Sequence, residues 1–181
     1  MKIVQFEDLV SLVNELPQDY EKYVRVCSET EIPEPYRELL VHHNHMTVAL
    51  ERWYDSPVEV VVLGETHDDP FYGRLIQLRL AGTEQVVEYG IMRIDLRACG
   101  DAVREAILSH SAPLGRILID HGMLTDVVYD LFLEFSADPR IMDALGVDES
   151  KPFFGRLASI HENGRHVVDL LEIMPADLER R

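Results

Sequence analysis

The run "FFGRLASIHENGRHVVDLLEIM", from Phe153 to Met174, decides the fold. Two mainly apolar stretches flank the dipeptide Asn163-Gly164, which readily takes the positive φ angles of a two-residue type I′ turn. On both sides of the dipeptide the apolar residues alternate with a period of two, as in half-buried strands. The sequence therefore predicts a β-hairpin here, as part of an antiparallel sheet.

The second strand of this hairpin carries one acidic residue on each face. One face holds His166, Val168, Leu170, Glu172 and Met174, and the other holds Val167, Asp169, Leu171 and Ile173. A carboxylate among buried aliphatic side chains is costly unless it is paired or hydrogen-bonded. Alternation alone leaves Asp169 and Glu172 as equal candidates for the interior.

The rest of the chain extends this sheet and adds helices. Helical spacing predicts helices over 6–16, 36–54 (two short ones), 101–121 (two, the second starting at Pro113) and 138–146. Period-two alternation predicts further strands over 57–65, 71–80, 85–96 and 123–136. About six strands with antiparallel connections, and helices before and between them, indicate an α+β fold. We expect a helical extension over 1–32 and one domain over 33–181.

The predicted strand over 123–136 has two distinct faces. One face is expected to hold Met123, Val127, Tyr129, Leu131, Leu133 and Phe135, and the other Asp126, Asp130 and Glu134. This alternation is strongly typical of a β-strand.

Composition excludes several classes of protein. The net charge of −16, with the 17 Lys and Arg residues dispersed, argues against nucleic acid and anionic membrane surfaces as partners. No apolar run approaches the ~18 residues that span a bilayer, and the N-terminus lacks a signal-peptide pattern. Cys27 and Cys99 show no metal or redox spacing. We expect a cytoplasmic protein with reduced thiols.

Arg74 interrupts an apolar face in the same way as the two acids. It shares a face of the predicted strand 71–80 with Tyr72, Ile76, Leu78 and Leu80. An inward Arg would suit bidentate recognition of a carboxylate, whereas an Arg near a strand start can also reach solvent. If Arg74 and Glu172 both face inward, they form either a structural ion pair or two ends of a ligand pocket.

No cofactor or metal site is predicted. His42, His43 and His45 are close together, but their spacing differs from the i, i+4 helical pair of zinc enzymes, and no further ligand completes a set. Nucleophile and nucleotide-binding signatures are also missing.

Five ordered segments resemble the chorismate lyase superfamily. "HMTVALE", "YGRLIQL", "PLGRILI", "FFGRLASI" and "NGRHVVDLLEIMP" occur in the order and with the spacings of that superfamily, over roughly residues 33–176. The chain is most similar to its stand-alone bacterial and archaeal branch. The resemblance implies a six-stranded antiparallel sheet with helices and flap-like segments that enclose a ligand site.

The resemblance also implies an activity, the elimination of pyruvate from chorismate to leave 4-hydroxybenzoate, without metal or organic cofactor. It assigns the ring carboxylate to Arg74 and to backbone groups at Met46 and Leu114. It assigns the para hydroxyl and the proton transfer to Glu172, so that Arg74 and Glu172 are the expected catalytic residues.

Two other functions stay open. The same fold serves as the effector-binding domain of certain bacterial transcription regulators, so a non-catalytic sensor of an aromatic acid is one alternative. Such a regulator would place a DNA-binding module in front, and the first 32 residues have few basic side chains. The other alternative is a lyase for a related acid, because Thr125-Asp126 stands where relatives often have an Arg nearby.

Overall fold

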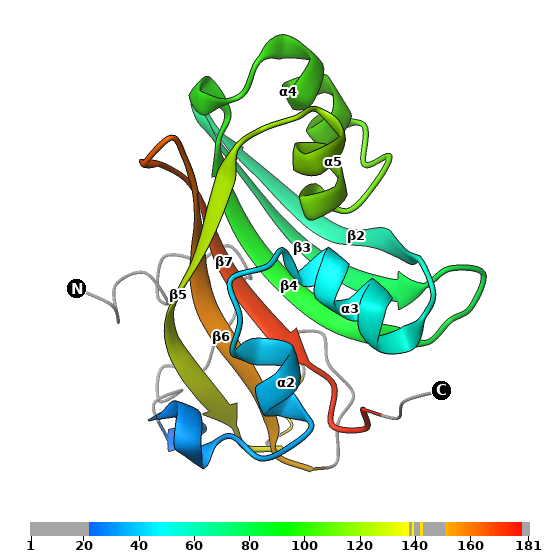
Figure 1. The fold of residues 1–181 in the computed structure, drawn as a ribbon, viewed down its shortest axis with the longest axis vertical. Coiled ribbons are helices and arrows are strands. Elements are labelled where there is room, and N and C mark those ends of the chain that lie inside the picture. Colours follow the sequence, from blue (N-terminus) through cyan, green and yellow to red (C-terminus); the bar gives the residue numbers. More distant parts are fainter. Residues whose placement is uncertain (1–21, 138, 140–141, 143–150, 179–181) are drawn as a thin grey trace.

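A seven-stranded antiparallel sheet forms the centre of the structure, with helices on one of its faces (Figure 1). The computed structural model describes residues 22–137, 139, 142 and 151–178. The strand order is β1-β5-β6-β7-β4-β3-β2. The strands are β1 (Val24–Cys27), β2 (Val58–Asp68), β3 (Phe71–Leu80), β4 (Val86–Asp95), β5 (Thr125–Phe135), β6 (Phe153–Glu162) and β7 (Arg165–Met174).

Within the described ranges, the helices with defined bounds are four α-helices and two short 3-10 helices. The α-helices are α2 (Tyr36–Leu40), α3 (Met46–Tyr54), α4 (Asp101–Leu108) and α5 (Leu114–Asp120), and the 3-10 helices are η2 (Glu29–Glu31) and η3 (Leu96–Ala98). These elements confirm the predicted α+β class, the two short helices within 36–54 and the second helix after Pro113. The helix predicted over 6–16 lies outside the described residues. Of the helix predicted over 138–146, only residues 139 and 142 are described.

The predicted hairpin is confirmed. β6 and β7 pair from Phe154 opposite Met174 to Glu162 opposite Arg165, with one register shift between Ile160 and His161. Asn163 and Gly164 have φ angles of 49° and 77°, as the type I′ turn requires. This hairpin lies in the middle of the sheet, so its side chains help to build both faces.

The sheet has one strand more than the expected six. β1 lies within the stretch 1–32, for which a helical extension was expected, and pairs with β5 from Val24 opposite Phe135 to Cys27 opposite Phe132. A four-residue edge strand gives too short a pattern for periodicity to detect. The described end of this stretch therefore belongs to the sheet.

β5 also differs from its predicted pattern in its second half. The register with β6 shifts between Tyr129 and Leu131, which is the signature of a β-bulge. After the shift Phe132 joins Val127 in the core on the helix side, whereas Leu133 and Phe135 join the apolar cluster on the opposite side. The expectation that Val127, Leu133 and Phe135 share one face is therefore wrong beyond the bulge, because one extra residue reverses the alternation.

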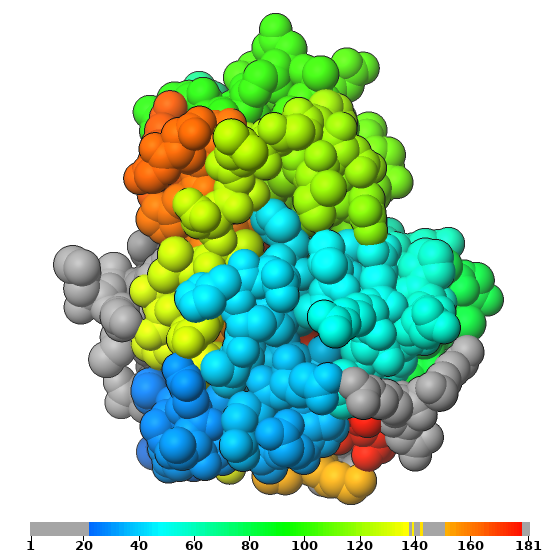
Figure 2. All heavy atoms as spheres, in the orientation of Figure 1, coloured from blue at the N-terminus to red at the C-terminus, as the bar shows by residue number. Residues whose placement is uncertain are grey.

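The helix-covered face, called the inner face below, holds the main core. Most even-numbered residues of β3, β4, β6 and β7 point into this core together with side chains of α2, α3 and α5. Figure 2 shows that α2, the loop after it, α3 and α5 cover much of this face. The opposite face carries a second, smaller apolar cluster that includes Tyr89, Phe135 and Leu171. A ligand site on the inner face would therefore be enclosed between sheet and helices.

Candidate functional site

A small cavity lies between the inner face and the first turns of α3 and α5. Its volume is about 30 Å³, whereas an engineered apolar cavity of ~150 Å³ is needed to bind benzene. Its walls are mainly aliphatic and contain two carboxylic acids. The lining residues are His45, Met46, Thr47, Ile76, Leu78, Glu88, Gly90, Met92, Pro113, Leu114, Gly115, Val127, Ile160, Leu170, Leu171 and Glu172.

Two glycines shape this cavity by lacking a side chain. A Cβ at Gly90 would lie 2.9 Å from Cγ1 of Ile76, so any larger residue there would push into the cavity floor. A Cβ at Gly115 would lie 2.9 Å from Cβ of His45 and 3.0 Å from Oγ1 of Thr47. Gly115 therefore lets the starts of α3 and α5 meet above the sheet.

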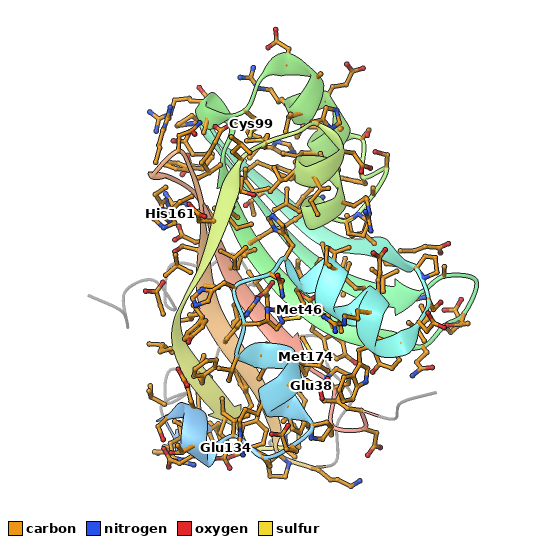
Figure 3. The ribbon with its side chains drawn as sticks, viewed as in Figure 1. Glu38, Met46, Cys99, Glu134, His161 and Met174 are labelled. Atoms are coloured by element: carbon orange, nitrogen blue, oxygen red, sulfur yellow. The ribbon has the colours of Figure 1, made fainter. Side chains whose placement is uncertain are left out.

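Met46 and Leu114 occupy equivalent places in these two helices. Each is the first residue of its helix, α3 or α5, and each lines the cavity. Figure 3 shows Met46 over the centre of the sheet. Backbone N–H groups in a first helical turn have no acceptor within the helix. The structure thus brings together the two residues whose backbone groups the resemblance assigned to a carboxylate.

Glu172 points inward, as the resemblance required, and Asp169 points to the opposite face. Asp169 accepts a hydrogen bond from Nε2 of His166 at 2.8 Å, if the ring is protonated there. Glu172 is 5% exposed and lines the cavity. Its carboxylate accepts a hydrogen bond from Nε of Arg156 at 2.6 Å. Of the two arrangements left open for Glu172 and Arg74, the ion pair is not formed, because the partner of Glu172 is Arg156.

Arg156 ties the sheet to the segment that covers it. It has no exposed surface, and its Nη1 donates to the carbonyl oxygens of Leu40 and His42, both at 2.8 Å. Its Nη2 has no hydrogen-bond partner. A buried guanidinium with a paired carboxylate and two carbonyl acceptors is well compensated. Arg156 is thus a structural clamp as well as the neutralising partner of Glu172.

Arg74 is the buried cation without such compensation. It is 1% exposed, and neither Nη1 nor Nη2 has a hydrogen-bond partner. Its Nε donates to Sδ of Met92 at 3.2 Å. Burial lowers the pKa of Arg74, against which the hydroxyl of Tyr72 and the carboxylate of Glu65 act. An arginine still keeps its charge at ordinary pH.

Arg74 is close to the cavity but does not line it. It lies directly across from Met92 on β4 and from Glu65 on β2. Glu65 is partly exposed and already accepts a hydrogen bond from Tyr72, with His110 3.1 Å away. Of the four predicted site residues, Met46, Leu114 and Glu172 thus surround the cavity, and Arg74 stands behind Met92.

Sequence reasoning missed Glu88, a second buried acid. It is 3% exposed, lines the cavity, and its Oε2 has no hydrogen-bond partner. Burial raises the pKa of Glu88 well above its usual value, and the nearby carboxylate of Glu172 raises it further, while Arg156 opposes the shift. Glu88 is therefore a neutral carboxylic acid over much of the acid range and can donate a hydrogen bond.

A signal for Glu88 and for Arg156 was present in the alternation. Glu88 shares its face of β4 with Gly90, Met92 and Ile94, and Arg156 shares its face of β6 with Phe154, Ala158 and Ile160. Each is a charged residue that interrupts an apolar strand face, which is the feature that singled out Arg74 and Glu172.

The three clustered histidines have separate partners. Nδ1 of His43 lies 2.9 Å from the carbonyl oxygen of Val127, and Nε2 of His45 lies 2.9 Å from Oγ1 of Thr125. His42 lies beside Arg156, and burial followed by that positive charge lowers the pKa of His42. No group of three or more metal-binding side chains occurs in the described part of the chain. These histidines hold the α2–α3 loop against β5 and β6.

Comparison with known proteins gives a fold and no family. No protein-family model matches the chain, and no curated protein matches its sequence. The solved effector domain of PhnF from Mycobacterium smegmatis is similar over 74% of this chain and 90% of that domain, with 15% identity and a TM-score of 0.54. A further structure of PhnF has 15% identity and a TM-score of 0.53, with coverage of 76% and 66%. The gene product SA0254 from Staphylococcus aureus subsp. aureus N315 has 8% identity and a TM-score of 0.52, with coverage of 76% and 91%.

This comparison corrects the expectation of an enzyme. The fold is that of the solved effector domain of PhnF, and no family-level match supports the expected carbon–oxygen lyase. In the structure, the carboxylate to which the resemblance assigned the proton transfer, that of Glu172, is paired with Arg156. In the described residues, no helix is long and apolar enough to cross a membrane.

The buried ion pair gives a prediction for stability. Replacing Arg156 by Met leaves Glu172 buried without a partner, so the free energy of unfolding should fall by about 3–5 kcal/mol. The control is Arg25→Met, which removes an exposed Arg that pairs with Glu134 and Glu31 and should lower stability far less, because solvent screens exposed ion pairs. Urea denaturation followed by circular dichroism measures both values. Equal losses in the two variants would show that the Arg156–Glu172 pair is not a stabilising clamp.

The buried acid Glu88 gives a prediction for pH dependence. Its pKa is higher in the folded than in the unfolded protein, so the folded state binds the additional proton and loses stability as pH rises above about 4.5. Glu88→Gln mimics the protonated acid and removes this loss. The variant should match the wild type near pH 4 and become more stable than it as pH rises, by up to ~1.4 kcal/mol per pH unit within the window between the two pKa values. Urea denaturation from pH 4 to 8 measures the difference, with Glu59→Gln on the exposed side of β2 as control. A pH-independent difference would contradict the prediction.

Proposed function

We propose that this chain is a non-catalytic ligand-binding domain that senses a small carboxylic acid with an apolar, ring-sized body. The ligand would occupy the cavity under α3 and α5, expanded from its ligand-free volume, with its carboxylate on Arg74. The observation that carries the proposal is the burial of Arg74 with two unpartnered terminal nitrogens.

The charges on the inner face support an anionic ligand. The charged residues buried there, within the described chain, are Arg74, Glu88, Arg156 and Glu172. Arg156 and Glu172 neutralise each other, and the raised pKa of Glu88 favours its neutral form. One positive charge, that of Arg74, is left over. A monoanion would balance it, and a planar carboxylate fits the fork of two guanidinium nitrogens.

The cavity lining supports an apolar body for this anion. Ile76, Leu78, Val127, Ile160 and Leu170 present aliphatic surface, which suits a ring or a short branched chain better than a polar body. The neutral acid of Glu88 offers a hydrogen-bond donor at the wall. A hydroxyl or carbonyl oxygen on the ligand would satisfy it. Substituted benzoates such as 4-hydroxybenzoate have these features.

The similarity to effector domains supports a binding role without catalysis. The solved PhnF domain is named for effector binding, and this chain shares its fold. A sensor needs a site that recognises its ligand and releases it unchanged. The pairing of the Glu172 carboxylate with Arg156 supports recognition over catalysis.

Binding of benzoate tests the proposal, with benzamide as a neutral molecule of the same shape. Benzoate and 4-hydroxybenzoate should bind in isothermal titration calorimetry and benzamide should not. Arg74→Met should weaken benzoate binding by ~1.5–3 kcal/mol, or about 10–150-fold. Because it removes an uncompensated buried charge, this variant should be at least as stable as the wild type.

The matched control is Arg79→Met on the same strand. Arg79 bonds the side chains of Gln77 and Glu84 and lies away from the cavity, so benzoate affinity should be retained. Chorismate incubated with the protein should yield no pyruvate. Equal affinity for benzoate and benzamide, or equal effects of the two Arg variants, would overturn the proposal.

A further inference from the structure

Resting on the proposed function, we propose that Met92 is a movable wall between the cavity and Arg74, and that it sets the size of the ligand. In the ligand-free protein its thioether occupies the place that the ligand's carboxylate takes on binding. The inference concerns one residue that neither the resemblance nor the comparisons assign.

Met92 and Arg74 are direct neighbours on the inner face. They lie opposite each other on the adjacent strands β4 and β3. The Nε of Arg74 donates to Sδ of Met92 at 3.2 Å. Met92 lines the cavity, and Arg74 does not. The side chain of Met92 is therefore the layer that separates the buried cation from the empty space.

A ring-sized ligand can enter the cavity only if part of the cavity wall moves. About 30 Å³ accommodates roughly one water molecule, and a six-membered ring needs several times more. The increase has to come from a side chain that can leave its position while the sheet stays intact. Moving Met92 would both enlarge the cavity and connect it to Arg74.

Met92 is better suited to this movement than the other residues of the wall. Methionine has three unbranched, rotatable side-chain bonds, whereas Ile76, Val127 and Ile160 are β-branched and stiff. Glu172 is held by Arg156, and His45 by Thr125. Met46 also lines the cavity and is flexible, but Met92 is the residue that accepts a hydrogen bond from Arg74.

Exchange of the thioether for a carboxylate would favour the ligand-bound arrangement. A thioether sulfur is a weak, uncharged acceptor and serves only Nε of Arg74. A carboxylate can accept two charge-assisted hydrogen bonds and can use the terminal nitrogens that now have no partner. The ligand also has to fill the space that Met92 leaves, so acetate should bind much more weakly than benzoate.

Nuclear magnetic resonance of the full chain, labelled with [ε-13C]methionine, tests the movement directly. The 13C shift of the methyl group depends on the rotamer of the terminal side-chain bond. Benzoate should change the rotamer-dependent 13C shift of Met92 and move the Nε–H proton of Arg74 downfield. Met174 is the internal control, because it is equally buried on the same face but does not line the cavity (Figure 3). Its methyl signal should stay unchanged.

Substitution of the two methionines tests the consequence for affinity. Met92→Ala removes the wall and should tighten benzoate binding about tenfold, which corresponds to ~1.4 kcal/mol. It should also reduce the preference for benzoate over larger naphthoates. Met174→Ala removes the same side chain away from the cavity and should change both quantities by less than about twofold.

The outcomes separate this inference from the proposed function. Benzoate binding that depends on Arg74 but leaves the Met92 methyl signal in its free rotamer would overturn the movable wall and keep the sensor. Unchanged or weaker benzoate binding by folded Met92→Ala would also overturn it. The labelled wild type decides the question if Met92→Ala does not fold. Benzoate that fails to bind at all would reject both proposals.

Discussion

Arg156 has no exposed surface, and it donates hydrogen bonds to acceptors from two layers of the molecule. Its Nε holds Glu172 on the neighbouring strand, while its Nη1 holds the carbonyl oxygens of Leu40 and His42 above the sheet. One side chain thus fixes the centre of the sheet and the loop between α2 and α3. The position of that loop sets where α3 begins, and so places His45 and Met46 over the cavity. Removal of this contact would leave both the carboxylate and the loop without their anchor.

Pairing of Glu172 with Arg156 also determines what the remaining buried groups can do. The negative charge of Glu172 adds to burial in favouring the neutral form of Glu88 across the cavity. Arg74 has one hydrogen-bond partner, the thioether of Met92, while its two terminal nitrogens have none. The arrangement combines a compensated ion pair, a neutral acid and one cation whose terminal nitrogens are unpartnered. In the proposed function, that cation is the group that binds the anionic ligand.

Alternation predicted which side chains face inward but not which of them meet. Glu172 and Arg74 both point to the inner face, as one interpretation of their strands had it, and Asp169 points away. Which of the inward-facing residues lie opposite each other depends on the order of the strands in the sheet. β7 lies between β6 and β4, so the residues opposite Glu172 are Arg156 and Gly90, and Arg74 is two strands away and in a different row. Periodicity within a strand contains no information on its neighbours. The four-residue β1 and the bulge in β5 were missed for a related reason, since pairing with another strand defines both.

The resemblance to chorismate lyases and the similarity to effector domains concern the same backbone, and a fold alone does not determine function. A lyase and a sensor require different properties of the site on the inner face. A lyase works best with a preformed site, because positioning of the substrate supplies much of its rate enhancement. A sensor has to adopt a different state when its ligand is present, and a ligand can shift an equilibrium only by its different affinity for the two states. A cavity of about 30 Å³ beside an uncompensated guanidinium cannot accept a ring without rearrangement. In the proposed function, this rearrangement is what turns binding into a signal. In the proposed arrangement Met92 covers Arg74 in the ligand-free protein, and a ligand can displace this side chain because it is uncharged and flexible.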